Sequence, residues 1–363
     1  MEDGVDLAVV GGGVVGCAIA AEASARGLSV ALLEREPGLG RGGTARNSGV
    51  LHSGLYYRPG SVAATACVRG QALCYELAAA LGVPHRRTGK LVVAHDDAEL
   101  EALDALLANA AASGARDVER VTGGRAAQLE PAMRQPLGAL WCPHTGIIDA
   151  PALASALAAR AARGGALVAV GAAVLGAAPS AGGTRLDTGR GPILAAQVVN
   201  SAGLGAPAIA ALLGDEAPTL WPCRGDWYAL RAQRPPARLV YPVRAAGQTG
   251  LGVHVCLDLG GGVRLGPDAR FTADADLGTP PPSTLLDAFR AAGERLLGPL
   301  PPGALRWDGA GVRPRLRGPD DPGPVEFRIE RGRSGALHLF GVESPGLTAA
   351  PALAELVLQR IVA

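Results

Sequence analysis

The first 34 residues change periodicity twice, and the change predicts a strand, a helix and a second strand. Residues 6–10 and 29–33 are short apolar runs typical of buried strands, and the second run ends at Glu34. Between them lie a glycine-rich turn at 11–16 and a run of small residues at 17–26, which predicts a closely packed helix. We therefore expect a βαβ unit.

Further along, the same patterns predict a mixed α/β chain. Helices are expected at residues 61–81, 98–112, 150–163, from the proline-rich break at 280–282 to 297, and at 347–362, with another helix start within 118–131. Strands are expected at residues 91–94, 166–170, 197–201 and 337–342, and a β-meander with a turn at Gly182-Gly183 is expected between 170 and 197.

A second sheet is expected in the latter half of the chain. Residues 227–230, 239–241, 252–258 and 262–265 alternate apolar with polar positions, as antiparallel strands with one face in water do. The fold class expected is therefore α/β, with a Rossmann-like domain interleaved with a second α+β domain built on an antiparallel sheet. We assign 1–85, 140–215 and 305–363 to the first domain, and 86–139 and 216–304 to the second.

Charge and cysteine content exclude several classes of partner. The formal net charge is +1, and the basic residues are scattered arginines with the single Lys90, so there is no basic stripe to bind nucleic acid. The six cysteines lack the paired spacing of metal ligands and favour a reducing, cytoplasmic compartment. We expect neither a nucleic-acid partner nor a metal ion.

The apolar beginning of the chain is not expected to be a signal peptide, because Glu2, Asp3 and Asp6 stand where a positive region should be. No run of about 20 apolar residues is free of charges, since the alanine-rich stretch at 150–178 contains Arg160. The sequence thus predicts a soluble protein without a transmembrane segment, and peripheral membrane contact stays open.

The glycines of the first turn carry the first chemical signal. Gly11, Gly13 and Gly16 have the spacing G-x-G-x-x-G, which permits a tight turn, the approach of a pyrophosphate and close packing of helix on strand. The helix N-terminus stabilises an anion. Glu34, 18 positions beyond Gly16, is placed to accept hydrogen bonds from a ribose diol. Alone such a turn is often structural, but between a strand and a helix it predicts dinucleotide binding.

Two later segments favour FAD over NAD. Residues 199–203 form a strand ending in small residues, which allows close approach to a pyrophosphate, although an ordinary strand-to-helix turn has the same pattern. Residues 341–348 lead from a strand into a helix, whose N-terminus favours negative charge on a reduced flavin. In addition, Glu34 leads into a long loop rather than into a third Rossmann repeat. The cofactor expected is FAD.

On these motifs the chain resembles the L-2-hydroxyglutarate dehydrogenase/oxidase branch of the D-amino-acid-oxidase-like FAD enzymes. Residues 46–61 and 88–94 are similar to that branch's signature and its next strand. Shorter motifs keep the family's order at 146–149, 222–228, 241–243, 251–254, 309–313 and 343–348. The resemblance implies FAD in the first lobe and a substrate beneath the sheet of the second lobe.

The motifs and the resemblance together imply a set of cofactor-binding residues. It comprises Gly11, Gly13, Val14, Val15, Gly16, Glu34, Arg35, Arg46, Asn47, Ser48, Gly49, His52, Val174, Ala202, Gly203, Glu343, Gly346, Leu347 and Thr348.

The chain departs from the family mainly in the second lobe. Its helical segment at 271–300 is shorter than usual, Pro314-Arg315 stands where relatives usually have Ala-Gln, and Cys223 replaces an aromatic residue. Asp226 in place of Glu is a milder change. We expect these departures to affect substrate choice.

The resemblance implies oxidation of a small 2-hydroxy acid, similar to L-2-hydroxyglutarate, to the 2-oxo acid, with hydride transfer from C2 to flavin N5 and transfer of the hydroxyl proton to a base. A histidine suits the base because its ordinary pKa is about 6.5. His254, on an expected strand of the substrate domain, is the favoured base, and a hydrogen-bonded sheet residue is the alternative. Four alternative roles stay open for His52: packing on the flavin, orienting the substrate, tethering FAD covalently, or a plain loop role.

Arginines are the expected ligands of the substrate carboxylate, because a guanidinium donates two parallel hydrogen bonds. Arg313 and Arg224 lie in matching motifs, and a surface ion pair is the alternative for each. Tyr57 completes the catalytic set. Tyr241 and Lys90 are weaker candidates, since an aromatic residue or a lone lysine beside a strand is more often packing.

The expected partners are a small carboxylate substrate and an electron acceptor, either oxygen or a quinone. Two other functions stay open. One is a small amine or amino-acid oxidase of the same superfamily, and the other is a catalytically idle FAD-binding protein, suggested by the short segment at 271–300 and the altered motif at Arg313.

Overall fold

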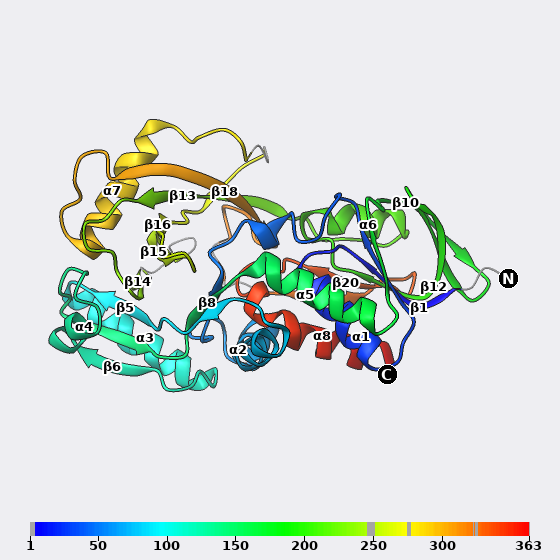
Figure 1. The fold of residues 1–363 in the computed structure, drawn as a ribbon, viewed down its shortest axis with the longest axis horizontal. Coiled ribbons are helices and arrows are strands. Elements are labelled where there is room, and N and C mark those ends of the chain that lie inside the picture. The colour runs from blue at the N-terminus through cyan, green and yellow to red at the C-terminus, as the bar shows by residue number, and fades with distance from the viewer. Residues whose placement is uncertain (1–3, 245–250, 274–276, 322, 324–325, 363) are drawn as a thin grey trace.

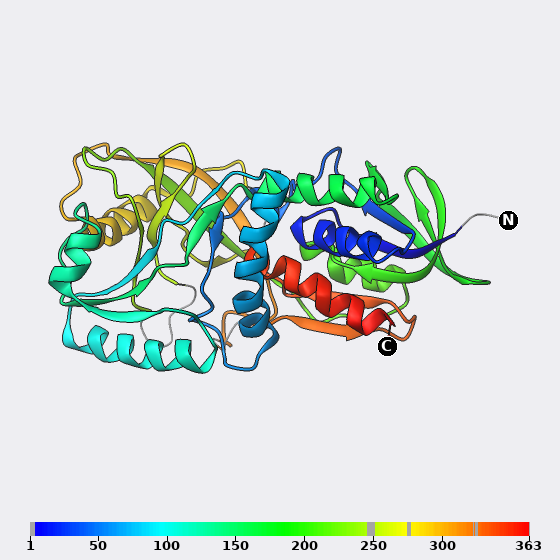
Figure 2. The same cartoon turned by 60° about the horizontal axis from the view of Figure 1, so that its bottom comes forward.

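The computed structural model describes residues 4–244, 251–273, 277–321, 323 and 326–362. The chain forms an elongated molecule with two lobes, each built around its own sheet (Figure 1). Helix α2 (Val62–Leu81) stands at the junction of the lobes (Figure 2). The two-lobed α/β fold confirms the predicted fold class.

Parallel strands form the centre of the sheet in the first lobe, in the order β20 (Leu337–Phe340), β12 (Gly191–Asn200), β1 (Val5–Val10), β2 (Val30–Glu34) and β9 (Leu167–Val170). Helix α1 (Val14–Ala25) connects β1 to β2 and confirms the predicted βαβ unit. The last four residues of β1 are buried, as in parallel sheets with both faces covered.

Helices cover one face of this sheet. The apolar sides of α1, α5 (Ala150–Arg163) and α8 (Gly346–Val362) pack on β1 and β2 in one core cluster, and α2 packs on α8. Pro351 lies inside α8, near its beginning. The closing helix of the chain thereby brings the segment before it, residues 341–346, back to the end of the central strands.

An antiparallel meander flanks the central strands, as predicted. It consists of β10 (Val174–Ser180), β11 (Gly183–Thr188) and β12, and its turn contains Gly182 and Gly183 with φ of 89° and 144°. Short helix α6 (Ala206–Leu212) packs nearby, and β19 (Arg328–Arg331) pairs with β20.

The second lobe contains a larger sheet, with the order β17 (Arg270–Phe271), β13 (Trp221–Leu230), β16 (Val263–Gly266), β15 (His254–Leu257), β14 (Leu239–Pro242), β5 (Lys90–Ala94), β7 (Gly138–Cys142) and β6 (Glu119–Thr122). Strand β18 (Leu305–Arg315) pairs along β13. The sheet is antiparallel except between β5 and β14, which are parallel.

The expectation that one face of this sheet lies in water is wrong for its central strands. Every residue of β5 and β15 is buried. Helices α3 (Asp97–Ala112) and α7 (Ser283–Leu297) cover one face, while Tyr241 and His254, two polar residues of the alternating strands, line a cavity on the other. The polar face is thus a lining rather than a solvated surface.

The remaining elements are short. They are the small sheet of β3 (Val50–Leu51), β8 (Gly146–Ile148) and β4 (His85–Arg86), the 3-10 turns η1 (Gly43–Ala45) and η2 (Gly203–Gly205), and helix α4 (Gly123–Leu129), which packs on β6 and β7 of the second lobe. No helix among the described residues is long and apolar enough to span a membrane.

The domain boundaries remain a prediction, and the strand pairing in the two sheets allows us to refine it. Strand β7, which straddles the boundary at 140, and strand β18, which the prediction assigns to the FAD-binding domain, both pair in the sheet of the second lobe. We propose that the second domain extends through Cys142 and Arg315.

Candidate active site

A cavity of about 840 Å³ lies between the lobes and is lined by both. Its size falls within the range of about 300–1,000 Å³ typical of ligand pockets. The lining comes from segments far apart in the sequence, namely the turn at 11–15, the loop at 34–57, residues 201–205, strands β13, β14, β15 and β18, and residues 342–347. The fold therefore brings the predicted nucleotide and substrate segments to one space.

The glycine turn forms the floor at one end of this cavity. Gly11 has φ of 109°, and a Cβ there would lie 2.7 Å from the carbonyl oxygen of Ser201. A Cβ at Gly16 would overlap the Gly11 carbonyl oxygen, so this glycine supports helix packing rather than lining the cavity. Gly13 supplies no side-chain cap to helix α1 and the first turn has no acidic residue, so the first N–H groups other than that of Val14, which donates to Thr44, favour an anion.

Glu34 lies beside that turn at the end of β2 and lines the cavity. Its Oε2 accepts a hydrogen bond of 2.6 Å from the Gly12 N–H, and its Oε1 accepts one of 2.8 Å from the Glu36 N–H. Both carboxylate oxygens are held by the backbone and keep further lone pairs. This arrangement suits a ribose diol, as the sequence predicts.

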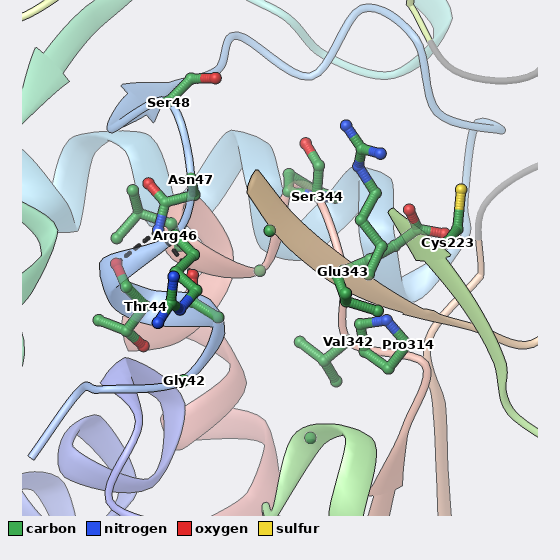
Figure 3. A pocket seen from close by; sticks show the side chains of 18 of the residues that line it. Gly42, Thr44, Arg46, Asn47, Ser48, Cys223, Pro314, Val342, Glu343 and Ser344 are labelled. Carbon is green, nitrogen blue, oxygen red and sulfur yellow. Dashed lines mark hydrogen bonds between the residues drawn. The ribbon is translucent and has the colours of Figure 1, made fainter. Parts of the chain in front are cut away.

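The loop after β2 closes around η1 and is braced by its own side chains. Asn47 donates to the carbonyls of Gly43 and Thr44 at 3.0 and 2.7 Å, and its Oδ1 accepts from the Gly49 N–H at 2.7 Å (Figure 3). Thr44 in turn accepts a hydrogen bond of 3.0 Å from the Val14 N–H of helix α1. The loop is thereby fixed to the helix N-terminus that faces the cofactor region.

The turn after β12 is fixed by a buried polar network. His338 Nε2 donates to Asp215 at 3.0 Å, so its Nδ1 accepts from the Asn200 amide, also at 3.0 Å. Asn200 Oδ1 accepts from the Ala202 N–H at 3.3 Å. Ala202 and Gly203 line the cavity beside the glycine turn, as expected of a second segment near a pyrophosphate.

The segment before α8 forms another wall of the cavity, where Glu343, Gly346 and Leu347 are lining residues. Arg315 donates to Glu343 at 3.1 Å, and both side chains are nearly buried. Burial raises the pKa of the Glu343 carboxyl, and Arg315 and then Arg313 act against this rise. Figure 3 shows Glu343 and Ser344 across the cavity from the loop that carries Arg46 and Asn47.

Most of the predicted cofactor residues line this one cavity. Those that do are Gly11, Gly13, Val14, Val15, Glu34, Arg35, Arg46, Asn47, Ser48, His52, Ala202, Gly203, Glu343, Gly346 and Leu347. Gly16, Gly49, Thr348 and Val174 do not. Thr348 is fully buried and accepts a hydrogen bond of 3.0 Å from the His52 N–H, whereas Val174 begins the meander and packs in its core.

His254 lies on β15 and faces the cavity. Its Nδ1 donates to the Gly252 carbonyl at 2.7 Å, because a carbonyl only accepts. This bond sets the tautomer with an unprotonated Nε2, to which no described residue donates. The ring stacks on Tyr241, with centroids 3.7 Å apart. Burial lowers the pKa of His254 to about 3, so the imidazole is neutral and able to accept a proton.

His52 lines the same cavity from the other lobe and is likewise buried. Its Nε2 lies 3.3 Å from the Ser344 hydroxyl, and its buried Nδ1 has no hydrogen-bond partner among the described residues. Burial, followed by Lys90 and His254, holds its pKa well below the ordinary value. Tyr57, also in the lining, lies 3.3 Å from the same hydroxyl.

The structure separates the two predicted arginines. Arg313 lines the cavity and donates to the Asp268 carbonyl at 3.1 Å, but it forms no salt bridge with a described carboxylate. Arg224 does not line the cavity and instead forms a salt bridge of 2.8 Å with Asp226. The physical reason is strand alternation, because Cys223 on β13 faces the cavity and its neighbour Arg224 points to the other face. Arg224 therefore leaves the proposed substrate set.

Several lining residues were missed or undervalued in the sequence. Thr44, Tyr56, Ser344 and Arg315 had not been singled out as site residues, and Tyr241 had been ranked as packing. A hydroxyl residue in the glycine-rich loop was the available signal for Thr44. The Arg315 signal was the departure from the family motif, but its partner Glu343 became visible only in three dimensions.

The cavity fits FAD by its own geometry. The first turn of helix α1 and the adjoining small-residue turn at Ala202 would offer backbone groups to the pyrophosphate of FAD, and the Glu34 carboxylate lies at the end of the adjacent strand. The rest of the cavity extends under the sheet of the second lobe, where His254 and Arg313 are found.

Known proteins match the chain along nearly its whole length. The model of the DAO family, described as FAD dependent oxidoreductase, matches residues 6–360. The mitochondrial L-2-hydroxyglutarate dehydrogenase of Arabidopsis thaliana is 32% identical over 409 residues, covering 98% of this chain and 83% of that protein. The corresponding Caenorhabditis elegans enzyme is 36% identical over 276 residues, covering 73% of this chain and 63% of that protein.

A solved structure also matches. The FAD-bound, dithionite-reduced L-alpha-glycerophosphate oxidase from Mycoplasma pneumoniae superposes with a TM-score of 0.87 at 25% identity, covering 99% of this chain and 95% of that one. Sequence, fold and cavity thus agree on the cofactor as FAD and on an enzyme. The chain belongs to the DAO family of FAD-dependent oxidoreductases and is similar to its L-2-hydroxyglutarate dehydrogenases.

Proposed function

We propose that this enzyme oxidises a small 2-hydroxy acid, similar to L-2-hydroxyglutarate, to the 2-oxo acid. The observation that carries the proposal is the pairing of Arg313 with His254 on the sheet side of the cavity. The two side chains are close enough for the Arg313 charge to contribute to the low pKa of His254. A 2-hydroxy acid carries a carboxylate and a hydroxyl on adjacent carbons, one group for each of these two residues.

Arg313 is the proposed carboxylate ligand. Its guanidinium is permanently charged, is only half-buried and has no carboxylate partner among the described residues. The neighbouring Arg315 is already paired with Glu343 and therefore contributes less free charge. An incoming carboxylate would thus gain charge-assisted hydrogen bonds from a guanidinium that forms no salt bridge with a described carboxylate.

His254 is the proposed proton acceptor. Its Nε2 takes the proton of the 2-hydroxyl while the C2–O bond becomes a carbonyl, and the Gly252 carbonyl stabilises the protonated ring through Nδ1. FAD, when bound, supplies the acceptor for the hydride that leaves C2, by the proposed transfer to flavin N5. The low pKa in the empty cavity rises when an anionic substrate binds, because a negative charge favours the charged imidazole.

The relatives support the same chemistry. Their names describe oxidation of L-2-hydroxyglutarate and of L-alpha-glycerophosphate, both of which place a hydroxyl-bearing carbon near an anionic group. The six cysteines are free and buried, which supports the predicted reducing, cytoplasmic setting. The electron acceptor, oxygen or a quinone, and peripheral membrane contact stay open predictions.

The experiment that tests the function is an anaerobic titration of the FAD-loaded enzyme with a panel of 2-hydroxy acids and the matching 2-amino acids. We expect L-2-hydroxy acids to bleach the oxidised flavin and amino acids to leave it unchanged. Bleaching by amino acids alone would replace the proposal with the amine-oxidase alternative. The idle-protein alternative is set aside because the chain is an oxidoreductase of the DAO family.

A further inference from the structure

The cavity face of the second sheet carries a row of three side chains from adjacent strands. Strands β5, β14 and β15 lie side by side in the left lobe of Figure 1. Tyr241 pairs in register with Val92, so by strand alternation Lys90 shares their face. His254 stacks on the Tyr241 ring at an interplanar angle of 23°. Lys90, Tyr241 and His254 therefore form one continuous group at the sheet side of the cavity.

Lys90 is an unusual member of this row because its charge is fully buried. Its Nζ has no hydrogen-bond partner among the described residues and forms no ion pair with a described carboxylate. Instead it lies 4.8 Å from the centroid of the Tyr56 ring and 4.9 Å from that of Tyr241. Cation–π attraction grows when both partners are desolvated, so these two rings hold the ammonium in place.

A purely structural role does not account for this arrangement. A buried charge without a counter-ion is costly, and an apolar side chain of similar length would fill the same space at lower cost. Elsewhere in the cavity wall the buried cation Arg315 is paired with Glu343. Lys90 lacks such a partner, so its charge itself calls for a functional explanation.

The charge acts on the two histidines of the cavity. Burial is the main cause of the low pKa of His254, and Lys90 and Arg313 add to it. Burial is also the main cause for His52, and Lys90 and His254 add to it. The titratable groups facing His254 are thus Lys90 from β5, Tyr241 from β14, Arg313 from β18 and His52 from the flavin loop.

Lys90 itself is subject to opposing influences. Burial lowers its pKa, while the thiols of Cys142 and Cys67 act in the opposite direction. Cys142 is its register partner on β7 and is equally buried. This neighbour offers a matched control, because its substitution disturbs packing beside Lys90 but leaves the ammonium and both tyrosine rings.

We propose that Lys90 is a positioning residue for the reaction: its ammonium, held between Tyr56 and Tyr241, keeps the stack of Tyr241 on His254 in place and holds His254 in the neutral form that accepts the substrate proton. The proposal rests on the proposed function of His254 as the base. It assigns a role to the only lysine of the chain, and the role is electrostatic rather than one of direct substrate contact.

The test compares the FAD-loaded wild type with Lys90→Met and with the Cys142→Ala control. Flavin reduction fails below the pKa of the base, since a protonated imidazole cannot accept a proton. Removing a positive neighbour raises that pKa, so in Lys90→Met we expect the acid limb of the reduction rate to move by about one unit to higher pH. Cys142→Ala should keep the wild-type limb. Thermal stability of Lys90→Met should be unchanged or higher.

A second readout separates this proposal from the proposed function. NMR of histidines labelled at Cε1, in FAD-loaded protein without substrate and assigned with His254→Gln, reports the His254 pKa even if no 2-hydroxy acid is oxidised. The proposal is supported if the His254 pKa rises in Lys90→Met and if, in Tyr241→Leu, the His254 pKa rises or its titration curve no longer reaches a plateau. An unchanged His254 titration in Lys90→Met, or a shifted acid limb that Cys142→Ala reproduces, would overturn it.

Discussion

The two sides of the cavity bind by different means. On the nucleotide side, the proposed recognition uses mainly backbone groups: the glycine turn, the start of α1 and a carboxylate, Glu34, whose oxygens are held by N–H groups. On the sheet side it would come from side chains, and several buried polar atoms there have no hydrogen-bond partner among the described residues, among them Lys90 Nζ and Tyr241 Oη. The nucleotide side is therefore held by the backbone, whereas the sheet side depends on the charges of individual side chains.

The glycine turn gives the largest expected effect. Gly11 has a positive φ that alanine rarely adopts, and the Cβ of Gly11→Ala would lie too close to the Ser201 carbonyl. The turn would therefore have to move, and the proposed pyrophosphate site would be lost. We expect the purified variant to lose nearly all bound FAD, measured as the ratio of visible to ultraviolet absorbance. Gly43→Ala is the control, because it lies in the same cavity wall, has open space at Cβ and should retain FAD.

The base gives the next largest effect. His254→Gln should lower the limiting rate of anaerobic flavin reduction about 10²- to 10⁴-fold, the usual contribution of a general base, while FAD stays bound. Stopped-flow absorbance measures this rate. His52→Gln provides the comparison, and a larger loss there than in His254→Gln would transfer the role of base to His52.

Arg313→Ala tests the carboxylate ligand. Loss of a charge-assisted hydrogen bond of about 1.5–3 kcal/mol should raise the apparent Kd of the 2-hydroxy acid about ten- to a hundredfold, with little change in the limiting rate of flavin reduction. Arg224→Ala is the matched variant outside the cavity. Arg224→Ala should lower the urea midpoint of unfolding, because buried Asp226 loses one of its ion-pair partners. It should weaken substrate binding less than Arg313→Ala does.

The smallest effect is expected at Tyr57. Among the described residues its hydroxyl meets the Ser344 hydroxyl alone, at a long 3.3 Å, so Tyr57→Phe should change the reduction rate less than about threefold. The same stopped-flow assay measures it. A loss comparable to that of His254→Gln would show that the tyrosine, rather than the histidine, handles the substrate proton.

The sequence predicted the nucleotide side well because its signals are local. Gly11, Gly13 and Glu34 lie within one βαβ unit, and the periodicity of that unit gives both its structure and its function. The meander and its turn at Gly182 were predictable for the same reason.

The sheet side was harder to predict because its contacts join distant segments. Lys90 and Tyr241 look like packing residues until the parallel pairing of β5 with β14 places them on one face. The sequence pattern does not predict the long strand β18, so the position of Arg315 in the cavity wall could not be predicted either. Arg224 was misplaced because a motif does not state which way each strand residue points.

The central claim is most directly tested by a single turnover of the FAD-loaded enzyme with L-2-hydroxyglutarate in the absence of oxygen. The account predicts that the oxidised flavin absorbance disappears and that an equimolar amount of the 2-oxo acid is formed. A fully loaded flavin that stays oxidised with every 2-hydroxy acid, while a 2-amino acid or glycerophosphate bleaches it, would contradict the account.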